Sequence, residues 1–288
     1  MIETLKNSVN HWETDENDHL NVRFYVRRMM QTLRLGLRDL GLTAALDEQA
    51  LLRGLQTQHM RFVREARIAA PVSGWMGVLS ASGEPLQILT ELRHTGTGEV
   101  MAAFVHDFST QVNHQLQTDP LPAHAGSRGI AAAPVPYARL SLEEALDKGF
   151  HRIGRALADP AECDTEGYLE PEHFMGNFSN SMPNLWAHFS PAGDAVERGV
   201  TEGGAVLEYR MNYLAPLRAG EGFEIVSGVS ELADKTQRFV HLLFNLNTGE
   251  CCVASEAMAI TMDLVARKAI SIPAARRQVM EKLLLAPL

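Results

Sequence analysis

The first long pattern along the chain is helical. Between residues 22 and 42 apolar side chains recur every three or four positions, the period of one face of an α-helix. They are Phe24, Val26, Met29, Met30, Leu33, Leu37 and Leu40. Gly41 then predicts the end of the helix, and a second, shorter helical stretch lies near residues 46–54.

The pattern then changes to that of strands. Four runs alternate apolar and polar residues between Pro and Gly turns, as antiparallel strands do. They are residues 60–69, 74–82, 85–95 and 99–109. A long helix followed by an antiparallel meander indicates the α+β class.

The second half of the chain repeats this plan after a connector rich in Ala, Pro and Gly. A short helix and a strand lead to a second acidic cluster at a helix start, followed by four more strand-like runs and a tail helix. The four runs are residues 206–217, 223–232, 238–248 and 250–264. We therefore expect a first repeat at 1–112, a connector at 113–140, a second repeat at 141–270 and a helical tail at 271–288.

Direct comparison of the two halves supports an internal duplication. Asp15 falls on Asp164, a difference of 149 (164 minus 15), and the same offset sets His19 on Tyr168 and Tyr25 on Phe174. Further along, TGEVMAA at 97–103 falls on TGECCVA at 248–254, an offset of 151 (248 minus 97). Pro71 before Gly74 likewise echoes Pro216 before Gly220. Edge-to-edge pairing of the two meanders would give one continuous sheet with fewer exposed edges.

Composition excludes several classes of protein. With 288 residues, 45% of them hydrophobic, and a net charge of -9, the chain is unlike a nucleic-acid-binding or membrane-surface protein. No run approaches the roughly 18 apolar residues of a membrane span, and the N-terminus turns acidic where a signal peptide needs an apolar core. We therefore expect a cytoplasmic protein that does not contact the membrane.

The sequence offers little for a metal or a cofactor. Cys163, Cys251 and Cys252 form neither a CxxC pair nor a disulfide framework, so a reduced, structural role is favoured. HExxH, GxSxG and GxxxxGK[ST] are all absent. We therefore expect neither a metal nor a cofactor.

Polar residues crowd the start of the first helix, in the stretch WETDENDHLNVRFY at 12–25. Short polar side chains there could simply cap the helix, because their oxygens accept bonds from the N–H groups of its first turn. An ordered acid, amide and imidazole at a positively polarised helix end could instead be catalytic. Capping needs one such side chain rather than five, so the ordered set favours a catalytic cluster.

Six of these positions carry a resemblance: Asp15, Asn17, His19, Leu20, Asn21 and Tyr25. Their order and spacing, with a duplicated helix and antiparallel sheet around them, resemble the hot-dog thioesterase superfamily, in particular its double hot-dog members. The acyl-acyl-carrier-protein (acyl-ACP) thioesterases and their acyl-CoA relatives are the most similar. The segment FVRE at 62–65 resembles an arginine-glutamate pair of the same relatives and nominates Glu65.

The resemblance implies a tandem double hot-dog fold and an acyl-CoA thioesterase that releases a free acid and coenzyme A. Asp15 would attack the thioester to give an anhydride or would activate water as a general base. Asn17 and His19 would orient the carboxylate, and Glu65 would complete the water-activating group. Asn21 and Tyr25 are expected to bind substrate, and N–H groups at the helix start to bind the carbonyl oxygen.

The second repeat departs from this signature, because Tyr168 replaces the histidine while Asp164 remains. Asp164 and Tyr168 are therefore either a second site with a lone carboxylate or a structural remnant. We favour a role for the second copy as a remnant or in shaping the substrate site. Arg27, Arg28, Arg64 and Arg67 could meet coenzyme A phosphates, but charged faces are usually only solvated, and we do not count them as site residues.

Two other functions stay open. A hot-dog enoyl-CoA hydratase also pairs an aspartate with a histidine, but its D-x-N-P-x-H spacing places the histidine five positions after the acid, whereas His19 is four positions after Asp15 and no proline intervenes. A non-catalytic acyl-thioester binding protein would keep the fold without the chemistry. Acyl-CoA is the expected substrate, with acyl-ACP as the second candidate, and a homodimer is compatible with the duplicated unit.

Overall fold

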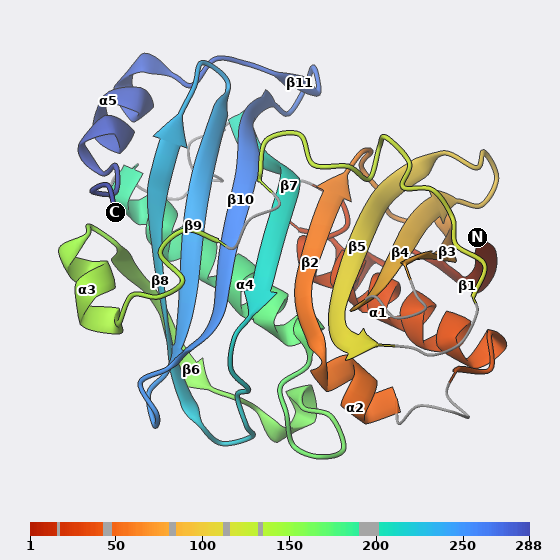
Figure 1. Cartoon of the computed structure of the whole chain (residues 1–288). Coiled ribbons are helices and arrows are strands. Elements are labelled where there is room, and N and C mark those ends of the chain that lie inside the picture. Colours follow the sequence, from red (N-terminus) through yellow and green to blue (C-terminus); the bar gives the residue numbers. More distant parts are fainter. Residues whose placement is uncertain (16–17, 43–47, 81–84, 112–115, 132–134, 190–201) are drawn as a thin grey trace. The chain divides into compact units, whose positions relative to one another are not determined.

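The computed structural model describes residues 1–15, 18–42, 48–80, 85–111, 116–131, 135–189 and 202–288. The chain divides into two compact units, Met1–Arg128 and Gly129–Leu288, and each contains a long helix and an antiparallel sheet (Figure 1). The α+β prediction is therefore confirmed. The unit boundary lies within the range 113–140 that the sequence predicts to be a connector.

The first unit begins with an edge strand that the hydrophobic pattern does not predict. Its elements are β1 (Ile2–Ser8), α1 (Val22–Asp39), α2 (Glu48–Arg53), β2 (Leu55–Phe62), β3 (Pro71–Ser80), β4 (Pro85–His94) and β5 (Val100–Gln111). The antiparallel sheet runs in the order β1-β3-β4-β5-β2. Because Leu5 is the only fully buried residue of β1, this strand shows no clear alternation of apolar and polar positions.

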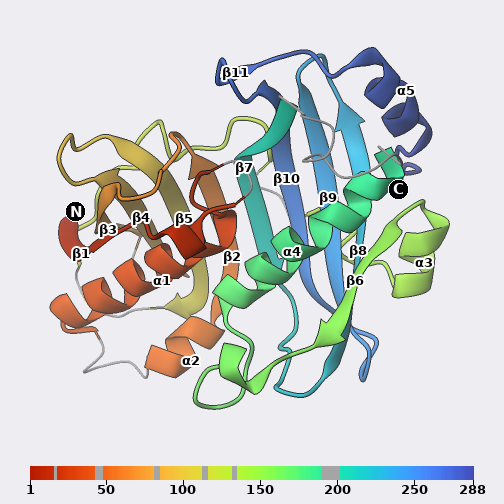
Figure 2. The ribbon, with the colours of Figure 1, turned by 180° about the vertical axis from the view of Figure 1, so that it is seen from behind.

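Helix α1 lies across one face of this sheet, against β1, β3 and β4 (Figure 2). The predicted apolar stripe faces inward: Val26, Met29, Met30, Leu33 and Leu37 are buried. Phe24 and Leu40, which the same pattern assigned to the stripe, stay partly exposed. Gly41 has a φ of 70°, in the left-handed region that suits a residue without a side chain, and the helix ends just before it.

Part of the predicted connector covers the other face of the first sheet. Ala125 is buried against Leu89, Ala103 and Val105. Nearby, Nε2 of His124 contacts a carboxylate oxygen of the buried Glu91 at 2.6 Å. Apolar packing and this polar contact therefore hold the segment to the sheet, and it is ordered despite its lack of periodicity.

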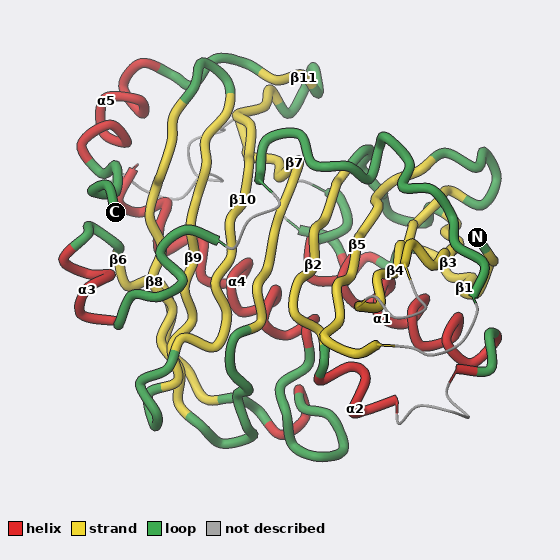
Figure 3. Tube along the Cα trace, in the orientation of Figure 1, coloured by secondary structure: helices red, strands yellow, loops and turns green. Residues whose placement is uncertain are grey.

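The second unit repeats the architecture of the first. Its elements are α3 (Leu142–Asp147), β6 (His151–Leu157), α4 (Pro171–Phe189), β7 (Glu202–Tyr213), β8 (Gly222–Leu232), β9 (Thr236–Asn245), β10 (Cys251–Asp263), β11 (Lys268–Ala269) and α5 (Ala274–Lys282) (Figure 3). The sheet order is β6-β8-β9-β10-β7, with the short β11 beside β10. Helix α4 packs on β6 and β8, as α1 packs on β1 and β3.

Two predicted strands have different limits in the structure. The run expected at 60–69 is a strand only to Phe62, where β2 ends, because the next two amides, those of Val63 and Arg64, both donate to Met101 O. The run expected at 206–217 ends at Tyr213 for the same reason, with two consecutive amides donating to Cys252 O. The chain leaves the sheet at both places, and in the first unit this exit brings Glu65 toward the start of α1.

None of the helices in the described part of the chain is long and apolar enough to cross a membrane. The predicted continuity of the two sheets concerns the relation between the units and stays a prediction, as do the predicted repeat limits.

Candidate active site at the start of the first long helix

The loop before α1 folds back on itself and brings an acid and an imidazole together. Thr14 and Leu20 form a β-bridge, and within it the Asp15 amide donates to His19 O at 3.0 Å. Asp18 takes a φ of 60° at the tip. As a result, Nδ1 of His19 lies 3.0 Å from Oδ2 of Asp15, with both side chains about 15% exposed (14% and 15%). Asn17 lies outside the described residues.

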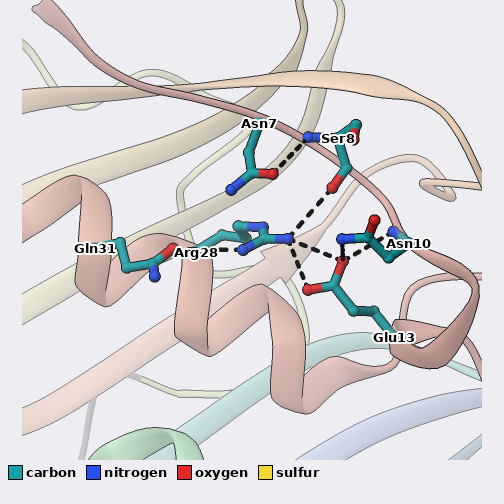
Figure 4. Close-up of polar contacts among 6 residues, drawn as sticks. All are labelled: Asn7, Ser8, Asn10, Glu13, Arg28 and Gln31. Carbon is teal, nitrogen blue, oxygen red and sulfur yellow. Dashed lines mark hydrogen bonds and ion pairs between the residues drawn. The ribbon is translucent and has the colours of Figure 1, made fainter.

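Glu13 is the acid of this loop that anchors it. Its side chain is only 2% exposed, and both carboxylate oxygens accept from Nη2 of Arg28, at 2.6 and 2.9 Å (Figure 4). The backbone and side-chain nitrogens of Asn10 also donate to Glu13, at 2.9 and 3.1 Å, and Arg28 donates to Ser8 O at 3.3 Å. This buried ion pair fixes the loop to the middle of α1, and it occupies Arg28, which the sequence left as a candidate for phosphate binding.

Asn21 caps the helix. Its side-chain oxygen accepts from the Arg23 amide at 2.9 Å, and its backbone oxygen accepts from Phe24 at 2.9 Å. The Asn21 amide donates to Glu13 O, so the cap is tied to the anchoring residue. The structure thus gives Asn21 a capping role, and substrate binding by this residue stays a prediction.

The segment after β2 meets the loop. The Leu20 amide donates to Ala66 O at 2.7 Å, and His19 forms a β-bridge with Arg67. Glu65 therefore lies next to the part of the chain that contacts His19 and Leu20. Its carboxylate is 30% exposed and lies 3.5 Å from Nη2 of Arg67. The sequence-predicted residues Asp15, His19 and Glu65 are thus brought to one place.

Tyr25 lies beneath this junction. Its hydroxyl donates to Arg64 O at 3.3 Å and accepts from the Ala66 amide at 3.0 Å. Burial raises the pKa of Tyr25 well above its ordinary value, and the carboxylates of Glu65 and Asp15 raise it further. The hydroxyl is therefore protonated at neutral pH and near both carboxylates.

In the second repeat the corresponding loop has the same backbone fold, and its acid bonds to the turn. The Asp164 amide donates to Tyr168 O at 2.8 Å, as Asp15 does to His19 O. Oδ1 of Asp164 accepts from the Glu166 and Tyr168 amides, both at 2.9 Å. The Tyr168 hydroxyl accepts from Arg218 at 2.7 Å. The Asp164 carboxylate therefore holds the turn itself.

Pro216 occupies the place of Glu65. Residues 214–221 repeat the backbone bonds of residues 63–70 at an offset of 151, including the amide of Leu169 donating to Leu217 O as Leu20 donates to Ala66 O. The sequence comparison that set Pro216 against Pro71 was wrong, because Pro71 begins β3 and matches Gly222, the first residue of β8. The second repeat thus replaces His19, Tyr25 and Glu65 by Tyr168, Phe174 and Pro216.

Among the described residues, no group of three or more His, Cys, Asp or Glu side chains is arranged to hold a metal ion. Burial raises the pKa of the Cys251 and Cys252 thiols to about 12. Burial also raises the pKa of Cys163, helped by the carboxylate of Asp164. These thiols are therefore poor nucleophiles at neutral pH.

Comparison with known proteins identifies the family. A model of the thioesterase-like superfamily matches residues 9–132 and 159–283, which is most of the chain. The chain belongs to the thioesterase-like superfamily. The two matched stretches fall one in each half and together include both helix-start loops. As a member of this superfamily the protein is a thioester hydrolase, which confirms the enzyme class expected from the sequence.

Solved structures confirm the tandem hot-dog fold of this thioesterase. An acyl-ACP thioesterase from Bacteroides thetaiotaomicron is similar over 89% of this chain and 96% of its own, with a TM-score of 0.60 and 10% sequence identity. A 12:0-ACP thioesterase from Umbellularia californica gives the same coverage, TM-score and identity. No curated protein matches the chain in sequence.

Sequence reasoning about the thioesterase missed the role of Glu13. The signal was present in two places: Asn10 and Glu13 have the spacing of a capping box, and Arg28 stands next to the buried Met29 on the apolar side of α1. A charged residue among buried positions needs a partner of opposite charge, and Glu13 is the partner that the fold supplies.

Proposed function

We propose that this thioesterase hydrolyses acyl-CoA to a free acid and coenzyme A at a single site centred on Asp15. The contact between Asp15 and His19 at the start of α1, beside the Glu65 segment, is the observation that carries the proposal. Acyl-ACP is the second candidate substrate, because the two solved structures of similar fold are named as acyl-ACP thioesterases.

Thioester hydrolysis needs little more than these groups. The thiolate is a good leaving group, so a strong general acid is not required. The reaction does require a nucleophile and a site that binds the carbonyl oxygen. Asp15 either attacks the carbonyl carbon to form an anhydride, which water then cleaves, or removes a proton from an attacking water. Both routes consume one water and release one acid and one thiol.

His19 and Glu65 support the acid in this scheme. The imidazole contacts one carboxylate oxygen of Asp15 and orients the carboxylate toward the substrate or the water. Glu65, beside the same loop, assists in orienting or deprotonating the water. The N-terminus of α1, which begins at Val22 directly after the loop, stabilises the negative charge that develops on the carbonyl oxygen. Asn17 keeps the orienting role expected from the sequence.

The second repeat has a structural role in this proposal. Because the carboxylate of Asp164 accepts two backbone bonds and Tyr168 stands in the place of His19, Asp164 stabilises its turn and takes no part in hydrolysis.

Thiol release from a panel of acyl-CoAs and acyl-ACPs, followed with a thiol reagent, tests the proposal. Asp15→Asn should lower kcat/KM at least about 100-fold, the usual effect of losing a nucleophile or general base. Asp164→Asn is the matched control and should leave kcat/KM within about twofold of the wild type.

Three outcomes would contradict it. No thiol release from any substrate would favour a binding protein without hydrolytic activity. Hydration of an enoyl-CoA without thiol release would favour the hydratase. Equal losses in the two aspartate variants would show that both repeats are catalytic.

A further inference from the structure

Tyr25 forms hydrogen bonds to the peptide groups on either side of Glu65. Its hydroxyl donates to the carbonyl of Arg64 and accepts from the amide of Ala66. The hydroxyl therefore fixes the backbone from which the Glu65 carboxylate extends.

We propose that Tyr25 is a positioning residue that holds Glu65 in register with the Asp15–His19 pair. The inference rests on the proposed function and assigns Tyr25 a task other than binding substrate. Its hydroxyl proton is already donated to Arg64 O, so it is not directed at a ligand.

The backbone of Ala66 is held at both its nitrogen and its oxygen. Its oxygen accepts from Leu20 at 2.7 Å, which ties it to the loop that carries His19, and its nitrogen donates to Tyr25 at 3.0 Å, which ties it to α1. Tyr25 is 4% exposed, so these bonds are shielded from water. The residue after Glu65 is thus held to both the loop and the helix, and the residue before it is held to the helix.

The second repeat shows what the tyrosine ring does without its hydroxyl. Phe174 occupies the place of Tyr25 and packs edge-on against Tyr213 at 5.9 Å, as Tyr25 packs against Phe62 at 5.2 Å. The surrounding backbone bonds are the same in both repeats, so the segment takes its shape without the hydroxyl. The residue between the held peptides is Pro216, and the second repeat therefore lacks both the hydroxyl and the carboxylate.

The second repeat lacks the hydroxyl of Tyr25 and the carboxylate of Glu65 together, and this distinguishes a role of the hydroxyl in packing from a role in positioning the carboxylate. If the hydroxyl served only to fold the segment, the second repeat would need it as much as the first. The hydroxyl is present in the repeat that has a carboxylate, Glu65, between the held peptide groups, and it is absent in the repeat that has Pro216 there. The pKa of Tyr25, raised by burial and by the two nearby carboxylates, keeps the proton on the hydroxyl over the working pH range.

The test is a double-mutant cycle between Tyr25→Phe and Glu65→Gln, with kcat and KM measured for one acyl-CoA that the wild type hydrolyses. Tyr25→Phe should lower kcat about tenfold and change KM less than about twofold, because a displaced group affects the chemical step more than binding. In the Glu65→Gln background the same substitution should have no further effect, since Tyr25 acts through Glu65.

A matched control comes from the second repeat. Tyr209 is also buried, and its hydroxyl is 3.1 Å from Oγ of Ser255. Tyr209→Phe therefore removes a comparable buried hydrogen bond and should leave kcat unchanged. Backbone amide hydrogen exchange of residues 64–67 should be at least about fivefold faster in Tyr25→Phe than in the wild type, and unchanged in Tyr209→Phe.

The outcomes separate the two proposals. Multiplicative losses in the double variant, unchanged exchange at residues 64–67, or a Tyr25→Phe chain that does not fold would overturn the positioning role and leave the Asp15 site intact. Wild-type turnover in Glu65→Gln would show that there is no carboxylate to position. An inactive wild type would overturn the proposed function and the positioning role together.

Discussion

Glu13 and Asp15 stand two positions apart in the sequence and have opposite surroundings. Glu13 is buried and bonded to Arg28 and Asn10, whereas Asp15 keeps partial exposure beside His19. A carboxylate that is buried and bonded to a guanidinium and an amide holds structure, and one that is partly exposed beside an imidazole can react. Residue type alone does not distinguish them, because the difference lies in which way the loop turns.

The buried pair of Glu13 and Arg28 should be important for stability when only one partner is removed. We expect Glu13→Gln or Arg28→Met to lower the free energy of unfolding by about 3–5 kcal/mol, because each leaves a buried charge without its partner. Urea unfolding measures this. Glu99→Gln breaks the exposed contact between Arg64 and Glu99 and should cost less than about 1 kcal/mol. Equal losses in the buried and exposed variants would contradict the anchoring role of Glu13.

His106 is a second buried polar residue with a defined consequence. Its two ring nitrogens contact Gln58 Nε2 at 3.0 Å and Thr90 Oγ1 at 2.8 Å, and burial lowers its pKa to about 4, with Asp107 opposing the shift. The imidazole is therefore neutral in the folded chain, while in the unfolded chain it takes up a proton near its ordinary pKa of 6.5.

Stability should fall as the pH drops through this interval. The unfolded state binds more protons between pH 6.5 and 4, so the contribution of His106 is fully present above pH 6.5 and is lost progressively below it, on the order of 3 kcal/mol at pH 4. Urea unfolding at several pH values should show a shallower decline for His106→Gln than for the wild type. Parallel curves would show that His106 is not the group responsible.

At the scale of elements, the two repeats fill the space between the long helix and its sheet with opposite arrangements of a large and a small residue. In the first, Leu5 of β1 is paired with Gly74 of β3 beneath Thr32 of α1. In the second, Gly154 of β6 is paired with Ile225 of β8 beneath a helix serine, Ser181. One large and one small residue lie under each helix hydroxyl, and the repeats exchange which strand supplies the large one.

This exchange predicts a rescue. A Cβ on Gly74 would lie 1.9 Å from Oγ1 of Thr32, so Gly74→Ile alone should unfold the chain or lower its midpoint strongly. Adding Leu5→Gly reproduces the arrangement of the second repeat and should recover part of the loss. Thermal unfolding of the single and double variants measures it, and a double variant less stable than Gly74→Ile would contradict the equivalence.

At the scale of the whole molecule, periodicity and duplication predicted most of the architecture. The helix at 22–42 and the four strands that follow it have strong patterns, and the same patterns in the second half of the sequence supported their prediction. Edge strand β1 was missed because it buries little, although its counterpart at 151–157 was recognised. The end of β2 was missed because Ala66 and Ile68 stand at even-numbered positions, as Met60 and Phe62 do, after the chain has left the sheet.

The site was predicted as a set of residues and not as a geometry. The order of Asp15, His19 and Tyr25 is local and therefore visible in the sequence. The approach of Glu65 depends on bonds between segments about 45 residues apart, from Leu20 to Ala66, which no local pattern encodes. The anchoring of the loop by Arg28 likewise depends on how α1 lies against it.

The turn held by Asp164 has a consequence for how this chain tolerates change. The first loop must satisfy both folding and a reaction, while the second must satisfy folding alone. In a saturation mutagenesis scan scored separately for abundance and turnover, substitutions at His19 and Glu65 should reduce turnover and spare abundance. At the second loop the sensitive positions should be Asp164, which accepts the turn's amides, and Gly167, whose φ of 83° excludes most side chains. Substitutions at these two positions should reduce abundance and turnover in proportion. Because the second repeat has only folding to satisfy, it should tolerate more sequence change than the first.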